Sequence, residues 1–106
     1  MTDLDKLIAA VESVTLSGEP EYQVLAESAV GEEWLSVAES YNGSLDAALR
    51  LHEALLPGWE ATVAMTGHAG VMFWPTETAQ NAKVNGQPAR AWLLAILRAL
   101  KAKGDA

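Results

Sequence analysis

The sequence predicts an α+β domain in which a small antiparallel β-sheet is layered with about four helices and a long final helix lies at the centre. Two patterns predict this class: apolar residues recur at helical spacing in several segments, and over residues 59–65 they alternate with polar residues as in a strand. A length of 106 residues, 50% of them hydrophobic, also suits one packed core, so residues 1–106 are expected to form a single domain. In this arrangement the N-terminal helices cover the second face of the sheet.

Two amphipathic helices are expected before residue 31. Thr2 is suited to cap the first helix, and acidic residues follow it in the first turn, where the helix dipole favours negative charge. The apolar stripe of this helix consists of Leu4, Leu7, Ile8, Val11 and Val14. Pro20 suits the first turn of the second helix, which covers residues 22–30 and ends at Gly31. Residues 32–43 fit both a helix and a strand, and we expect a helical turn followed by a loop.

Two further helices are expected later in the chain. Ser44 is a favourable N-cap residue for a helix over residues 45–56, which the following Pro-Gly pair ends. The residues expected to share one face of this helix are Leu45, Ala48, Leu49, His52 and Leu56. The final helix starts at Pro88 and extends to residue 103, and it is apolar around most of its circumference, which places it at the centre of the domain.

A β-hairpin is expected between these two helices. Residues 59–65 and 71–74 form its strands, and residues 66–70 form the loop. Pro75 ends the second strand, because proline cannot donate a hydrogen bond to the sheet. Residues 82–84 are a candidate third strand.

The two faces of this hairpin are expected to differ. Alternation places four large apolar side chains on one face: Trp59, Val63, Val71 and Phe73. Met72 and Trp74 point to the other face. Either a second layer of structure covers Met72 and Trp74, or they form a binding patch.

Charge is divided unevenly along the chain. Residues 1–60 contain twelve acidic residues against Lys6 and Arg50, a balance of −10, whereas residues 61–106 carry a balance of +3. Because affinity for nucleic acid comes largely from basic side chains, we expect no direct nucleic-acid binding. The acidic part is either a solvated surface or a docking surface for a basic protein groove.

The sequence contains no pattern typical of a catalytic or metal site. It has no cysteine, which excludes disulfides and thiolate ligands. The pair His52-Glu53 begins like a zinc-binding helix motif, but position 56 is leucine where a second histidine is required, so His52 is expected to be a partly buried helix residue. The pair Glu32-Glu33 lacks a pocket that would separate the pKa values of an acid and a base. We therefore expect no enzyme, no metal and no cofactor.

The residues that are candidates for an interaction surface are Glu32, Glu33, His68, Met72 and Trp74. A remote alternative is a small-ligand protein or an enzyme, in which His68 at the hairpin tip would act with Glu60 or Glu77 beside Trp74. The remaining tryptophans are expected to pack in the core, because they are not interleaved with basic residues as in a surface that stacks single-stranded bases.

One stretch of the chain contains Tyr41-Asn-Gly-Ser-Leu-Asp-Ala-Ala-Leu-Arg-Leu, then Leu56-Pro-Gly-Trp, the alternating hairpin, and Pro88-Ala-Arg-Ala-Trp-Leu-Leu-Ala-Ile-Leu-Arg-Ala-Leu-Lys. Over residues 41–103 it resembles the phage ABA sandwich family of small bacteriophage proteins, with Leu-His-Glu-Ala-Leu-Leu at residues 51–56 as a departure. The resemblance implies a phage or prophage origin and a layered α/β fold. It supplies no catalytic residues.

These observations lead to one expected function and two alternatives. We expect a non-enzymatic, phage- or prophage-encoded interaction protein of unassigned role in the cytoplasm of a bacterial host cell, without a membrane segment. The first alternative is an acidic inhibitor of a host nuclease or immune effector, whose carboxylates mimic phosphates. The small-ligand protein or enzyme is the second. The expected partner is another protein or a second copy of the chain in a homodimer, because the final helix and the hairpin carry much apolar surface.

Overall fold

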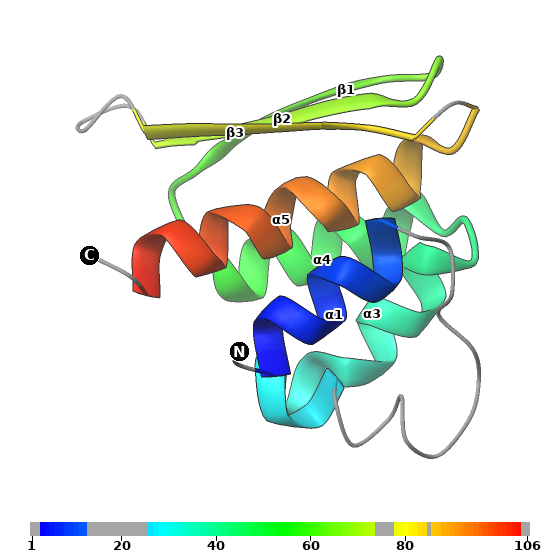
Figure 1. The fold of residues 1–106 in the computed structure, drawn as a ribbon. Coiled ribbons are helices and arrows are strands. Elements are labelled where there is room, and N and C mark those ends of the chain that lie inside the picture. Colours follow the sequence, from blue (N-terminus) through cyan, green and yellow to red (C-terminus); the bar gives the residue numbers. More distant parts are fainter. Residues whose placement is uncertain (1–2, 13–25, 74–77, 85, 105–106) are drawn as a thin grey trace.

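A computed structural model describes residues 3–12, 26–73, 78–84 and 86–104. It confirms the α+β class, with an antiparallel sheet as one layer and helices on one side of it (Figure 1). The elements are α1 (Asp3–Glu12), η1 (Gly31–Glu33), α3 (Trp34–Tyr41), α4 (Leu45–Leu55), β1 (Glu60–Ala64), β2 (His68–Phe73), β3 (Thr78–Lys83) and α5 (Pro88–Gly104). Residues 26–30 are also helical, and Gly31 follows them with a positive φ of 67°.

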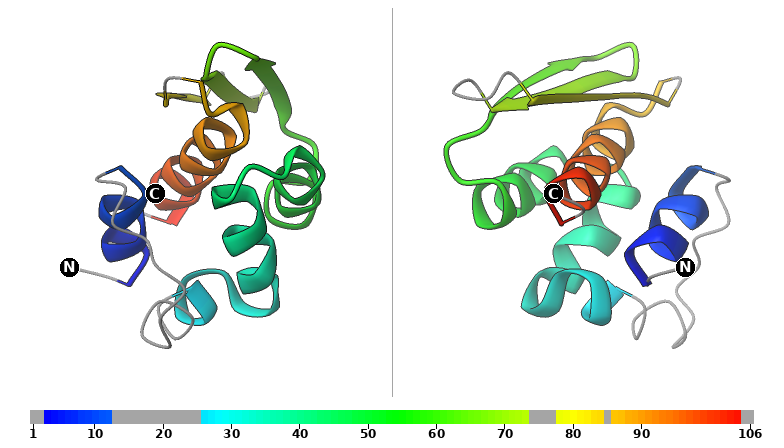
Figure 2. Two further views of the ribbon diagram at one scale, coloured as in Figure 1. Left: turned by 90° about the vertical axis from the view of Figure 1, so that its right-hand side faces the viewer. Right: turned by 60° about the vertical axis from the view of Figure 1, so that its left-hand side comes forward.

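The helix α5 occupies the middle of the molecule, as the sequence predicted. One side of it contacts β2 and β3, and the other sides contact α1, α3 and α4 (Figure 2). Residues 91–97 are all buried. A helix that is apolar around most of its circumference needs cover on opposite sides, and the sheet and the other helices supply it.

The position of the N-terminal helix differs from the prediction. We expected the N-terminal helices to cover the second face of the sheet, but α1 packs on α5, on the side away from the sheet (Figures 1 and 2). Leu7 and Val11 of α1 are buried in this contact region. The physical reason is that α5 offers α1 a broad apolar surface, whereas the second face of the sheet carries small and polar side chains.

Two ion pairs fasten α1 to α5. A guanidinium N–H of Arg98 donates to the Glu12 carboxylate at 2.9 Å, and Lys101 pairs with Asp5 at 2.7 Å. The Arg98 guanidinium also donates to the backbone carbonyl of Asn81 in β3 at 2.7 Å. This one arginine therefore joins the first helix, the last helix and an edge of the sheet.

Residues 34–41 form the full helix α3, so the expectation of a helical turn followed by a loop is wrong beyond the turn. Val37, Ser40 and Tyr41 are buried, and α3 packs on both α4 and α5. The C-terminal carbonyl of Tyr41 accepts two hydrogen bonds from the Arg90 guanidinium, at 3.1 and 3.0 Å. The same guanidinium lies 3.9 Å from the centre of the Tyr41 ring. Contacts from distant residues thus extend a helix that local spacing left ambiguous.

The helix α4 begins as predicted, because the Ser44 hydroxyl accepts a hydrogen bond from the Ala47 N–H at 3.1 Å. Its buried residues are Ala47, Ala48, Leu51 and His52. Leu49 was expected on the buried face but is 45% exposed. The predicted face of α4 was displaced around the helix axis. The face that actually meets α3 and α5 includes Leu51 and excludes Leu49.

The sheet has the strand order β1-β2-β3, with both neighbouring pairs antiparallel. The hairpin turn is tighter than expected, so His68 is the first residue of β2 and not a loop residue. Gly67 makes this turn with a φ of 106°, and its N–H donates to the Ala64 carbonyl at 2.9 Å. The candidate third strand exists and begins earlier than predicted, at Thr78.

The face of the sheet toward α5 confirms the predicted alternation for Val63 and Val71. Val71 is 1% exposed, and Val63 packs partly buried against the core. Ala69 and Ala82 are buried on the same face. Trp59, just before β1, also lies partly buried against the core. Trp74 lies outside the described residues.

Candidate functional site

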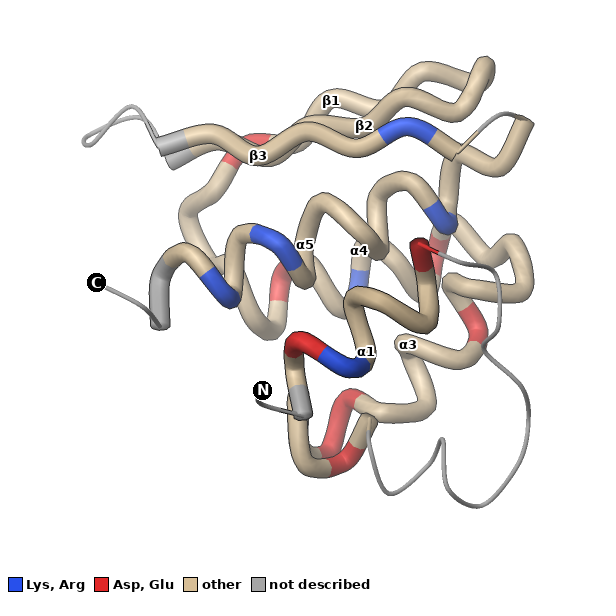
Figure 3. Tube along the Cα trace, in the orientation of Figure 1, with Lys and Arg blue, Asp and Glu red and all other residues tan. Residues whose placement is uncertain are grey.

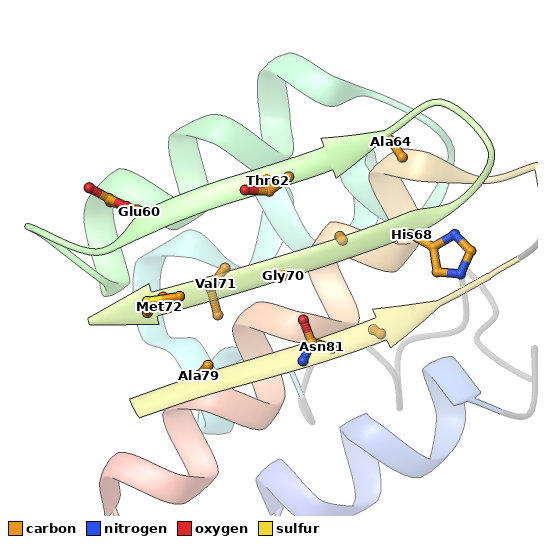
Figure 4. A pocket seen from close by; sticks show the side chains of 11 residues that line it. Glu60, Thr62, Ala64, His68, Gly70, Val71, Met72, Ala79 and Asn81 are labelled. Carbon is orange, nitrogen blue, oxygen red and sulfur yellow. The ribbon is translucent and has the colours of Figure 1, made fainter. Parts of the chain in front are cut away.

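The sheet face turned away from α5, here called the open face, is covered by no element of the described chain (Figures 1 and 4). Cross-strand register and alternation assign its residues in three rows across the sheet. The rows are Glu60–Met72–Ala79, Thr62–Gly70–Asn81 and Ala64–His68–Lys83. Most of these residues are exposed, and Met72 and Gly70 are half-buried.

The middle of the open face is hollowed. The hollow has a volume of about 340 Å³, and Figure 4 shows side chains from all three strands around it. Gly70 lies at its centre and contributes no side chain. The Asn81 side-chain oxygen occupies part of this space, only 2.6 Å from where a Cβ on Gly70 would stand. Thr62 lies opposite Gly70 on β1, so the Thr62 hydroxyl and the Asn81 amide flank the backbone of Gly70.

Two of the predicted interaction residues, His68 and Met72, lie on the open face. They belong to the same strand but lie at opposite ends of the hollow (Figure 4). His68 is exposed and stands between Ala64 and Lys83 in the register. Met72 stands between Glu60 and Ala79. Trp74, the third predicted residue of this face, lies outside the described residues.

The other two predicted residues, Glu32 and Glu33, are remote from the open face. They belong to η1, in the helical layer on the opposite side of α5 (Figures 1 and 3). The Glu33 carboxylate accepts a hydrogen bond from the Ser36 hydroxyl at 3.1 Å, so it is tied to the first turn of α3. The five residues predicted from the sequence therefore do not form one surface.

The acidic residues that the structure describes are spread over α1, residues 26–30, η1, α3, α4 and the start of β1 (Figure 3). Asp5 and Glu12 are used within the molecule, since they pair with Lys101 and Arg98 of α5. The uneven charge along the sequence is thus partly balanced in space by contacts between the first and last helices.

Glu60 and His68 do not converge as an acid–base pair requires. Glu60 and His68 stand at opposite ends of the hollow, four residues apart in the register, which corresponds to about 13 Å along the strands (Figure 4). A general base must lie within hydrogen-bonding reach of the proton it takes. Glu77 lies outside the described residues.

His52 is fully engaged inside the protein. It is 5% exposed, and its Nε2 lies 2.9 Å from the Trp59 carbonyl, while the Trp92 indole N–H points to its Nδ1 at 3.4 Å. Since an indole N–H can only donate, Nδ1 is the acceptor and Nε2 carries the proton. His52 is therefore a helix residue as predicted, and it is buried more completely than the expected partly buried position.

Two further features are absent from the described segments. No three or more histidine, aspartate and glutamate residues in these segments are grouped so that they could hold a metal ion. None of the helices there combines the length and the hydropathy needed to span a bilayer.

Sequence reasoning missed Thr62, Gly70 and Asn81, which form the centre of the hollow. The alternation of Thr62 with Val63 along the strand could have indicated that Thr62 points to the open face. Gly70 was assigned to a loop, and Asn81 preceded the expected third strand, so their juxtaposition depended on a register that no local pattern gives.

Comparisons with protein-family models, with curated proteins and with solved structures find no match to this chain.

Proposed function

We propose that this chain is a non-enzymatic interaction protein that binds a protein partner through the open face of its sheet. The observation that carries the proposal is that α5, which packs on one face only, leaves the other face exposed and hollowed. Protein–protein interfaces combine shape complementarity with polar groups placed among apolar ones. Thr62, Asn81 and Met72 give the hollow this composition.

A partner of a different kind is favoured over a second copy of the chain. The sequence predicts a homodimer because the final helix and both faces of the hairpin carry much apolar surface for so small a chain. The apolar surface of α5 is buried by the chain's own elements, and small or polar residues such as Thr62, Ala64 and Gly70 line the open face. The part of the argument that concerned α5 therefore does not favour self-association.

The origin we propose is a phage or prophage, with the protein acting inside a bacterial cell. This part rests on the resemblance over residues 41–103. Several residues of the resembling segments act in the framework: Ser44 caps α4, Arg90 binds the end of α3 at Tyr41, and Trp92 packs on His52 at a ring-centre distance of 5.8 Å. The resemblance therefore concerns the framework, and the open face is where this chain would acquire its own partner.

The proposal is tested by capture from bacterial lysate with three forms of the protein. Ala64→Arg places a long side chain beside the hollow, and Ala54→Arg makes the same exchange at an exposed position of α4. Both positions are exposed, so both variants should remain folded. We expect a stoichiometric partner that the wild type and Ala54→Arg retain and that Ala64→Arg loses. Equal capture by both variants, or capture of nothing, would contradict the proposal.

A further inference from the structure

The strand β1 is an edge of the sheet, and part of its backbone is directed away from β2. In the order β1-β2-β3 it has a neighbouring strand on one side only (Figure 4). The Ala64 carbonyl accepts the turn hydrogen bond from Gly67, so the even-numbered residues of β1 direct their backbone groups toward β2. Ala61 and Val63 therefore direct theirs outward. We call these two N–H and two C=O groups the outer edge of β1.

The opposite edge of the sheet, on β3, is closed in its middle. The Val84 N–H donates to the Gly67 carbonyl, so alternation along β3 directs the backbone groups of Asn81 outward. The Asn81 carbonyl is already used, because the Arg98 guanidinium donates to it at 2.7 Å. Lys83 lies on the same edge, and a charged side chain there opposes the addition of a strand. The strand β1 contains neither lysine nor proline, so it is the edge better suited to accept another strand.

The described helices cover β1 less completely than they cover β2. Ala61 and Val63 share the face of the sheet that is turned toward the helices, but Ala61 is exposed and Val63 is only partly buried. On the middle strand, Val71 is the register partner of Ala61 and is 1% exposed. The outer edge therefore has room for apolar side chains on its helical side.

The helix α4 offers an exposed apolar side chain in the layer below this edge. The Nε2–H of His52 donates to the carbonyl of Trp59 at 2.9 Å, so this side of α4 faces the residue that precedes β1. Leu49 lies one turn before His52 on the same side of the helix. Because the chain reverses direction between α4 and β1, this spacing places Leu49 alongside β1 in the direction of Ala61 (Figure 1). Leu49 is 45% exposed, and Met65, which directly follows β1, is 72% exposed.

These features suit an extended segment as the occupant. The two outward residues are separated by about 6.8 Å, which is the repeat at which a strand presents its own N–H and C=O groups. Alternate side chains of such a segment would lie beside Ala61 and Val63, toward Leu49, where apolar residues are favoured. The other side chains would lie on the open face beside Thr62, where polar residues are favoured.

A second copy of the chain fits this edge less well than a segment of another protein. Two β1 strands paired about a twofold axis would stand about 4.8 Å apart. The helix α4 lies in the helical layer on the β1 side of α5, so this pairing would bring both copies of α4 beneath the shared edge (Figure 2). Packed helices need about 8 to 10 Å between their axes, so the two copies of α4 would collide before the strands could pair.

We propose that the outer edge of β1 binds an extended segment of a protein partner, which joins the sheet as a fourth, antiparallel strand with apolar residues toward α4 and polar residues on the open face. Ala61 and Val63 would each exchange two hydrogen bonds with this segment. This goes beyond the proposed function, because the edge is a surface separate from the hollow of the open face.

The test uses as its probe a peptide of about seven residues that alternates threonine and valine between terminal lysines. N-methyl groups on its threonines leave only the valine N–H groups able to pair, and this pairing places valine toward α4. A control peptide with N-methyl groups on its valines can pair only with valine on the open face. Amide NMR shifts of the full chain are followed during titration. We expect a Kd below about 1 mM for the probe, the largest shifts at Ala61 and Val63, and binding of the control weaker by at least about five-fold.

Variants of the protein test the edge itself. Ala61→Pro removes an outward N–H without removing a hydrogen bond to β2, and should weaken binding of the probe by at least about ten-fold. Ala79→Pro is the matched control, because it removes an outward N–H at an exposed position of β3 and should leave affinity unaltered. Leu49→Ala should weaken binding by about three-fold through lost apolar contact, whereas Leu35→Ala at an exposed position of α3 should not.

Each outcome decides the proposal. Absence of binding at about 1 mM, equal affinity of the two peptides, shifts remote from β1, or equal effects of Ala61→Pro and Ala79→Pro would overturn it. If Ala61→Pro does not fold, equal affinity of Leu49→Ala and Leu35→Ala would overturn it instead. A doubled mass in solution that Ala61→Pro abolishes would show that a second copy takes the edge. Loss of lysate capture by Ala64→Arg tests the open face separately, because the backbone groups of Ala64 face β2.

Discussion

Replacement of Trp92 by alanine should destabilise the protein by about 3 to 5 kcal/mol. Trp92 is 8% exposed on α5, and its ring packs against His52 of α4. Truncation removes the transfer free energy of a large aromatic side chain and leaves a cavity between the two helices. The hydrogen bond to His52 is the smaller part of this figure, because a separation of 3.4 Å is long for an N–H donor.

Trp92→Phe separates these contributions. Phenylalanine keeps most of the ring volume but cannot donate to the Nδ1 atom of His52, so we expect a loss of about 1 kcal/mol. Domains of this size are stable by about 5 to 15 kcal/mol, so both variants should retain a measurable folded state.

The assay is urea unfolding followed by far-ultraviolet circular dichroism, because four tryptophans complicate fluorescence. The native spectrum should show more helix than strand. Leu49→Ala on the exposed side of α4 serves as the control and should change the free energy of unfolding by less than about 1 kcal/mol. A loss below about 1 kcal/mol for Trp92→Ala would refute the placement of α5 at the centre of the core.

Three other predictions address the turns, the caps and the assembly. Ser44→Ala should lower the free energy of unfolding by about 1 kcal/mol, because the Ala47 N–H loses its acceptor; an unchanged urea midpoint would argue against the cap. Gly67→Ala should destabilise the protein far more than Gly43→Ala, although both glycines have positive φ. A Cβ at Gly67 collides with the Val84 carbonyl, whereas none of the described atoms lies within 4 Å of a Cβ at Gly43. Equal midpoints of thermal unfolding for the two variants would contradict the turn geometry. Light scattering at micromolar concentration should give a mass near 11.3 kDa at every concentration, and a mass near twice that value would favour a dimer.

The elements that local signals define could be predicted from the sequence. Ser44 marks the start of α4, Pro88 marks the start of α5, and alternation over residues 59–65 identifies β1. Each signal acts through the conformation of its own segment. These local signals are therefore sufficient to predict the α+β class without any tertiary contact.

The elements that depend on distant partners could not be predicted. Residues 78–81 are polar apart from Ala79 and show no alternation of large apolar residues, and they become a strand because they pair with β2. The helix α3 ends where Arg90, 49 residues later in the chain, binds its last carbonyl. Burial of Leu51 in place of Leu49 depends on how α4 is rotated against its neighbours.

The candidate site also contains residues that could be predicted from local signals and residues that could not. Alternation alone placed Met72 on the face opposite Val71, and the structure confirms it. The hollow around Gly70 required the register of three strands. The sequence predicts Glu32 and Glu33 as interaction residues together with His68, but their distance in space depends on tertiary contacts that no local pattern gives.

The central position of α5 has a consequence for synthesis of the protein. The sheet and the helices α1, α3 and α4 bury their apolar faces against this 17-residue helix, which is the last described element to leave the ribosome. At about 5 to 20 residues per second, making it takes roughly 1 to 3 s. During that interval, α3 can pack on α4 and the strands can pair, but the helix that joins the sheet to the other helices is missing. The nascent chain therefore exposes the apolar faces that α5 covers to chaperones and proteases until α5 emerges, and a chain cut before Pro88 should fail to fold.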